Sequence, residues 1–182
     1  DITALTKGLT SREDVVSAVF DYVKKTMRWN GFYDYYCHDG VKQAYKSKTG
    51  NVAEINLMLT AMLRFAGVSA NPLLVSTRSN GIALFPNRTA FNYVIVAVEI
   101  EDGLILLDAT EKYALPNILP VRDLNWFGRL IREGGSSAEV DLMPKLLSKR
   151  VHNIAYGITE SGTIEGKIRK QLTDYEALDF RI

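Results

Sequence analysis

The sequence predicts an α+β fold in which one long apolar helix packs against an antiparallel sheet. Apolar residues recur at helical spacing from Val52 to Ala66, after a turn at Thr49-Gly50-Asn51 and before Gly67. Beyond that glycine the pattern changes to short segments rich in β-branched residues, two of them joined by a hairpin signal at Glu101-Asp102-Gly103. Helices followed by hairpin-linked strands are typical of α+β domains with an antiparallel sheet.

The composition is that of an ordinary globular domain without a charge bias. The chain has 182 residues, of which 47% are hydrophobic and 24% are charged, so it can bury a sizeable core. Twenty-two basic and 21 acidic residues leave a net charge of +1, which predicts neither nucleic acid nor an anionic membrane as a partner. The apolar runs, such as Asn92–Val98, are too short to span a bilayer, so no membrane insertion is expected. Because the chain begins with Asp1 and not with Met, we expect a mature fragment or an excised domain.

Two helices are predicted before the central one. Residues 1–10 are expected to be a lead-in, and the helix start signal at Thr10–Asp14 predicts a helix that ends near Met27. Trp29–Gly40 is aromatic and irregular, and Val41–Lys46 is expected to form a short helix. The apolar face of the first helix would consist of Val15, Val16, Val19, Phe20 and Val23.

The central helix has clear start and end signals. Asn51 can cap its first turn, and Gly67 suits the position after its last turn. A thiol in the first turn would have a lowered pKa because of the helix dipole, but the residue there is Val52. The expected apolar stripe consists of Val52, Ile55, Leu59, Met62, Leu63 and Ala66, joined by Met58 and Phe65.

Strands are predicted in two groups. The first group is Pro72–Thr77, Phe91–Glu99 and Leu104–Thr110, and a loop over Arg78–Thr89 joins its first two members. Residues 111–149 are expected to be loop-rich. The second group is Val151–Ile158, Thr163–Lys170 and Tyr175–Ile182. We therefore expect one domain over residues 1–146, and over residues 147–182 either the start of a C-terminal β-rich domain or strands added to the first.

Four motifs in this order resemble the transglutaminase-like superfamily, which shares the papain-like arrangement of Cys, His and Asp. They are Gly-Asn-x-Ala-Glu at 50–54, Ala-Met-Leu-Arg-x-Ala-Gly at 61–67, Phe-Asn-Tyr-Val-Ile at 91–95 and Leu-Leu-Asp-Ala-Thr at 106–110. The resemblance extends over roughly Ser11 to Pro144. More closely, the chain is similar to the transglutaminase-like region of bacterial multidomain proteins, often from Bacteroidetes, where that region lies between β-rich domains. The resemblance implies an exported protein with an extracytoplasmic location, either periplasmic or at the cell surface.

Carried onto this chain, the catalytic positions of the family fall on Val52 for the nucleophile, Tyr93 for the base and Asp108 for the orienting carboxylate. Only the carboxylate is retained. Valine has no lone pair, and tyrosine titrates near ~10, so neither can perform the step that the family requires at its position. The resemblance thus implies a pseudoenzyme that acts as a binding or scaffold module in a larger multidomain protein. We also expect Asp108 to accept a hydrogen bond from the Tyr93 hydroxyl.

Two other functions stay open. The first is an active cysteine-type amidase, peptidase or acyltransferase with an unrecognised nucleophile, for which Cys37 beside His38 and Asp39 is the candidate. Adjacent residues rarely point at one substrate atom, so a packed or idle thiol is the more common role for Cys37. The second is a purely structural spacer.

His152 stands alone and no His or Cys pair has ligand spacing, so no metal or other cofactor is predicted.

Candidate binding residues flank the same region. Asn51, Glu54 and Asn92 could form a polar rim around a cleft, although capping for Asn51 and a solvated face for Glu54 and Asn92 are the more common roles. Trp126 belongs to an aromatic set that suits a peptide or glycan ligand but that as often covers the edge of a core. The rest of this set is Trp29, Phe32, Tyr33, Tyr35, Tyr36 and Phe127. The loop arginines could attract an anionic ligand or be scattered over the surface, and they are Arg78, Arg88, Arg122 and Arg129.

Overall fold

The computed structural model describes residues 2–85, 87, 89–145 and 147–182, and it confirms the predicted α+β fold. The chain divides into two units, Asp1–Pro144 and Lys145–Ile182. The sequence placed this division after residue 146. Each unit is described by itself below.

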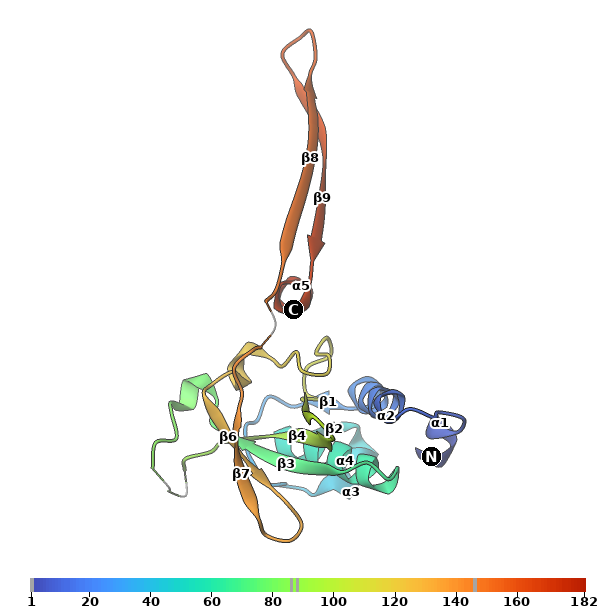
Figure 1. Ribbon diagram of the computed structural model, residues 1–182, viewed down its shortest axis with the longest axis vertical. Coiled ribbons are helices and arrows are strands. Elements are labelled where there is room, and N and C mark those ends of the chain that lie inside the picture. The colour runs from blue at the N-terminus through green and yellow to red at the C-terminus, as the bar shows by residue number, and fades with distance from the viewer. Residues whose placement is uncertain (1, 86, 88, 146) are drawn as a thin grey trace. The chain divides into compact units, whose positions relative to one another are not determined.

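The central helix of the first unit is α4 (Val52–Phe65), and it lies against strands β3 (Ala70–Val75) and β4 (Tyr93–Ile100) of the sheet (Figure 1). Helix α2 (Arg12–Thr26) also packs on α4 and buries the predicted face around Val19 and Phe20. Ile55, Leu59 and Leu63 of α4 are fully buried between these layers. Phe65 was expected on the apolar stripe, but it is 71% exposed because it is the last helical residue and points off that stripe.

The sheet of the first unit has five antiparallel strands in the order β5-β4-β3-β6-β7. Strand β5 (Gly103–Leu107) forms the predicted hairpin with β4. Strands β6 (Phe127–Ile131) and β7 (Ser137–Asp141) lie in the segment that the sequence predicted as loop-rich, and neither strand was predicted. Each has five residues and is only partly buried, so its apolar alternation is too short to stand out. The hairpin signal between them is Gly134-Gly135, where Gly135 takes a φ of +78°.

Short elements complete the first unit. Helix α1 (Ile2–Thr6) occupies the expected lead-in, and α3 (Val41–Ser47) matches the predicted short helix. Strand β1 (Arg28–Trp29) pairs in parallel with β2 (Thr49–Gly50), which brings the aromatic segment beside the start of α4. The 3₁₀ turns η1 (Arg78–Asn80) and η2 (Val121–Asp123) lie in the loops that follow β3 and β5.

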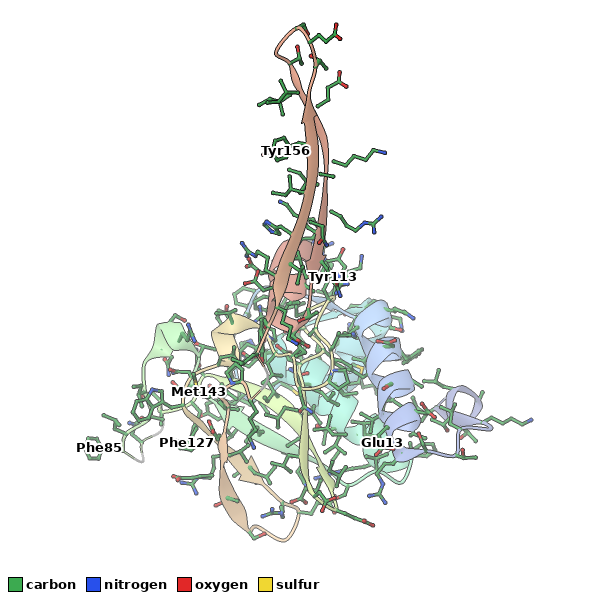
Figure 2. The ribbon with its side chains drawn as sticks, turned by 45° about the horizontal axis from the view of Figure 1, so that its top comes forward. Glu13, Phe85, Tyr113, Phe127, Met143 and Tyr156 are labelled. Atoms are coloured by element: carbon green, nitrogen blue, oxygen red, sulfur yellow. The ribbon has the colours of Figure 1, made fainter. Side chains whose placement is uncertain are left out.

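The second unit is a two-stranded ribbon followed by a helix. Strands β8 (Arg150–Ile158) and β9 (Ile164–Leu172) are antiparallel, and the side chain of Tyr156 projects outward from the ribbon (Figure 2). Helix α5 (Asp174–Arg181) forms where Tyr175–Ile182 was predicted as a strand. That prediction was wrong because acidic residues in the first turn and Arg181 in the last turn complement a helix dipole. Over the part of the chain that the structure describes, no helix is long and apolar enough to cross a membrane.

Candidate functional site

The entrance of α4 is built by a capping box. The Asn51 side chain accepts a hydrogen bond from the Glu54 amide at 2.8 Å, and the Glu54 carboxylate accepts one from the Asn51 amide at 2.8 Å. The second oxygen of Glu54 accepts from the amides of Asp39 at 2.7 Å and Gly40 at 3.0 Å. Asn51 Nδ2 donates to the carbonyl of Tyr36 at 3.0 Å. The two capping side chains therefore attach the aromatic loop to the helix start.

This arrangement changes the interpretation of the predicted polar rim. Asn51 and Glu54 are 1% and 2% exposed, so both lie inside the protein and Asn51 has the capping role. The solvated face expected for Glu54 is wrong because the capping box holds its side chain under the loop. Asn92 is half-buried. Its side-chain Oδ1 accepts a hydrogen bond from the Thr77 amide, and its Nδ2 donates one to Thr77 Oγ1, both at 2.9 Å. Trp126 is 54% exposed, so among these four candidates it alone presents most of its surface to solvent.

The three positions implied by the resemblance lie at the ends of core elements. Val52 is the first residue of α4, Tyr93 is the first residue of β4, and Asp108 directly follows β5. All three are 0% exposed. The Tyr93 hydroxyl donates to Asp108 Oδ2 at 2.9 Å, which confirms the predicted hydrogen bond.

Asn56 connects α4 to this site. Its Nδ2 donates to Asp108 Oδ1 at 2.9 Å and to the Val94 carbonyl at 2.9 Å, while its Oδ1 accepts from the Ala109 amide at 2.9 Å. Asn56 follows Val52 by one helical turn, on the same buried face. The sequence analysis did not identify it, although a polar residue within an apolar stripe was a usable signal.

Arg122 of η2 completes the hydrogen bonding around Asp108. Its Nη2 lies 3.3 Å from Asp108 Oδ2 and donates to Thr110 Oγ1 at 2.8 Å, and its Nε donates to the Tyr93 hydroxyl at 3.1 Å. The amide and hydroxyl of Thr110 also donate to Asp108, at 3.0 and 2.8 Å. The Asp108 carboxylate is thus paired with a guanidinium and surrounded by donors, an arrangement that satisfies a buried charge.

The aromatic loop covers this site. The Tyr33 ring lies 5.5 Å from the Tyr93 ring and 5.4 Å from the Trp29 ring, measured between centroids. The Arg122 guanidinium lies 4.8 Å from the Trp29 ring centroid. These side chains fill the space over Tyr93, and they act as a cover over the core. Phe32 and Tyr36 of the same loop are 64% and 56% exposed.

The Tyr93 hydroxyl acts as a hydrogen-bond donor to Asp108. Burial, and then the negative charge of Asp108, raise the pKa of the Tyr93 hydroxyl well above its ordinary value. The hydroxyl therefore keeps its proton at neutral pH, where a general base must be free to accept one.

The environment of Cys37 disfavours a nucleophilic thiolate. Burial, and then the charge of Glu54, raise the pKa of the half-buried Cys37 thiol. His38 Nε2 pairs with Asp34 Oδ2 at 2.7 Å, and this hydrogen bond raises the pKa of the imidazole. Among the residues described, no three His, Cys, Asp or Glu side chains gather as metal ligands.

The loop arginines have separate partners. Arg78 Nε donates to the Leu124 carbonyl at 2.8 Å, and Arg129 pairs with Glu139 at 3.2 Å. Arg129 lies on β6 and Arg122 is largely buried, so the expectation that both sit in surface loops was wrong. Arg88 lies outside the described residues.

The fold and this site define an α+β domain in which a capped central helix meets the ends of two sheet strands. Residues 2–109 match the model of the Transglutaminase-like superfamily, and the chain belongs to that family. The chain is also similar in structure to a protein from Parabacteroides distasonis ATCC 8503 that is named a putative protease, with a TM-score of 0.55 and 17% identity. That match covers 79% of this chain and 27% of the other, so this chain spans about a quarter of the neighbour's length. No curated protein matches the chain.

Proposed function

We propose that this domain is a pseudoenzyme, a catalytically inactive transglutaminase-like domain that serves as a binding or scaffold module in a larger protein. The observation that carries the proposal is the hydrogen bond from the Tyr93 hydroxyl to Asp108, within a site where both side chains are fully buried. In the family arrangement the Asp108 carboxylate would orient a catalytic imidazole. Here it holds a protonated phenol and a guanidinium.

The chemistry of the family needs a thiolate, a base that titrates near neutral pH and access for a carbonyl substrate. Val52 at the helix start supplies no nucleophile, and the raised pKa of Tyr93 removes the base. Tyr33 and Arg122 lie over Tyr93, so a substrate would have to displace both. These contacts support a structural role for the site.

The wider setting belongs to the same proposal. The neighbour of which this chain spans 27% supports a place within a longer protein. Flanking β-rich domains and an extracytoplasmic location follow from the resemblance, and a peptide or glycan ligand follows from the exposed aromatic side chains such as Trp126. The neighbour's name favours the competing proposal of a protease, for which Cys37 would be the nucleophile.

The test is an activity assay with matched variants. The purified chain is incubated with a glutamine peptide plus a primary amine, and separately with a mixed peptide library, and products are followed by mass spectrometry. We expect neither cross-linked nor cleaved products, and the Cys37→Ser variant should be indistinguishable from the original chain. Turnover that is lost in Cys37→Ser and blocked by a thiol-directed probe would overturn the proposal.

A further inference from the structure

One buried carboxyl group in the first unit has no hydrogen-bond donor among the described residues to stabilise a negative charge. Asp123, the last residue of η2, is 0% exposed. Neither of its carboxylate oxygens has a hydrogen-bond partner among the residues that the structure describes. A buried carboxylate without donors is strongly disfavoured, so the side chain needs another explanation.

Among the residues that the structure describes, the cation of this cluster is Arg122, and its donors already have other partners. Arg122 directs its donors to Tyr93, Asp108 and Thr110, and its Nη1 lies 3.9 Å from Glu111. After burial, the negative charge of Asp108 and a side-chain hydrogen bond with it both act to raise the pKa of Asp123, so Asp108 is the acidic neighbour of this group. If every acidic group were ionised, three carboxylates would face one guanidinium, and Asp123 would be the one without a donor.

The neighbouring elements supply no further charge to Asp123. From β4, the group that faces it is the neutral Tyr93 hydroxyl, and from the end of β5 it is Asp108. Arg78 of η1 reaches the carbonyl of Leu124, the next residue, and makes no hydrogen bond with the Asp123 carboxyl group.

We propose that Asp123 is a protonated carboxylic acid that donates its proton to Asp108, so that one proton holds η2 over the buried site. Protonation removes the uncompensated charge and turns an acceptor without a donor into a donor with an acceptor. Burial, and then the charge of Asp108, raise the pKa of Asp123 well above its ordinary value, in agreement with this state.

The consequence is a pH-sensitive lid. Asp123 and Arg122 both belong to η2; Arg122 contacts Tyr93 and Asp108 at the ends of β4 and β5, and Asp108 acts electrostatically on Asp123. Loss of the proton would place two buried carboxylates against each other, which repels η2 from the strand ends. Raising the pH therefore loosens the segment that covers Tyr93.

The sign of the pH dependence follows from the raised pKa. Below the unfolded-state pKa of an aspartate, about 3.9, both states carry the proton, so the stabilisation by this group is fully present and does not vary with pH. Above it, the unfolded chain releases the proton and the folded chain retains it. The unfolding equilibrium constant then increases about tenfold per pH unit until the pKa of the folded state is passed.

The test compares unfolding equilibria of three proteins between pH 5 and pH 9. They are the original chain, Asp123→Asn, which keeps the shape and always presents a donor, and Asp102→Asn, which removes the same charge from an exposed turn. The ratio of the unfolding constants of the original chain and Asp123→Asn should rise about tenfold per pH unit over the interval in which Asp123 stays protonated. Asp102→Asn should follow the original chain. A constant ratio for Asp123→Asn would overturn the proposal.

A second measurement does not depend on the variant folding. Carboxyl carbon NMR of the original chain should show one aspartate that remains protonated at pH 7 and that titrates only at higher pH. Amide exchange of residues 110–123, corrected for intrinsic rates, should increase over that same titration. A spectrum in which every aspartate is ionised at pH 7 would contradict the proposal. The unfolding and NMR measurements do not use enzyme activity. The proposal for Asp123 can therefore fail or hold independently of the proposed loss of catalysis.

Discussion

Glu54 and Asp123 are both acidic side chains buried in the first unit, at 2% and 0% exposure, yet their surroundings are opposite. Glu54 at the entrance of α4 accepts hydrogen bonds from the backbone amides of Asp39, Gly40 and Asn51. Asp123 on η2 faces another carboxyl group and has no donor among the described residues.

The difference shows that the supply of donors, more than burial, decides how a buried acid is accommodated. Backbone amides at a helix entrance stabilise a carboxylate because their positions are fixed by the fold. A site whose single cation is shared among several acceptors stabilises a neutral acid instead. Substitutions that change an acid to its amide should therefore have opposite effects at Glu54 and Asp123.

The largest effect is expected at Asp108, which accepts hydrogen bonds from Tyr93, Thr110 and Arg122. Asp108→Asn replaces one acceptor oxygen with a donor and removes the nearer of the two carboxylates that pair with the buried Arg122, at 3.3 Å against 3.9 Å for Glu111. We expect the free energy of unfolding to fall by about 4 kcal/mol, as for other buried ion pairs that lose one partner. Denaturant titration measures this, and a loss below about 1 kcal/mol would show that the cluster contributes little.

The next effect tests the other side of the comparison. Glu54→Gln places an amide group against backbone amides that need acceptors. The free energy of unfolding should fall by about 3 kcal/mol, because buried donors are left unpaired. Glu139→Gln is the control, since it breaks an exposed pair with Arg129 and should cost less than about 0.5 kcal/mol. Equal losses in the two variants would break the comparison.

A smaller effect separates the buried helix cap from an exposed one. Asn51→Ala removes the cap of α4 and the hydrogen bond to the Tyr36 carbonyl, so we expect a loss of about 2 kcal/mol. Ser11→Ala removes the cap of α2, whose hydrogen bond to Asp14 is exposed, and should cost about 1 kcal/mol. Thermal or denaturant unfolding checks both, and a larger loss at Ser11 would contradict the assigned role of the α4 entrance.

Most helices and strands of the first unit could be predicted from the sequence, because the patterns that specify them are local. The cap at Asn51, the apolar stripe of α4 and the hairpin at Glu101-Asp102-Gly103 each depend on residues a few positions apart. The Tyr93–Asp108 hydrogen bond was also predictable, because the family arrangement already places these two positions together.

The contribution of η2 to the site could not be predicted from the sequence, because it depends on contacts between residues far apart in the chain. Arg122 and Asp123 lie in a segment without helical or strand periodicity, and only the folded chain brings η2 to the ends of β4 and β5. The burial of Glu54 was missed for a related reason. Its partners include amides of a loop whose path no local pattern predicts.

The aromatic cover over Tyr93 also gives the domain an optical property. Trp29, Tyr33 and Tyr93 form a row of rings whose neighbouring centroids are 5.4 and 5.5 Å apart, a spacing at which excited tyrosines pass their energy to an indole. Because the Arg122 cation lies 4.8 Å from the centroid of the Trp29 ring, we expect it to change the emission of that indole. The other tryptophan of the chain, Trp126, is 54% exposed and emits from a solvent-facing position. In a Trp126→Phe chain, Trp29 is the remaining tryptophan. Its fluorescence should therefore report, without any added label, whether Arg122 contacts the Trp29 ring.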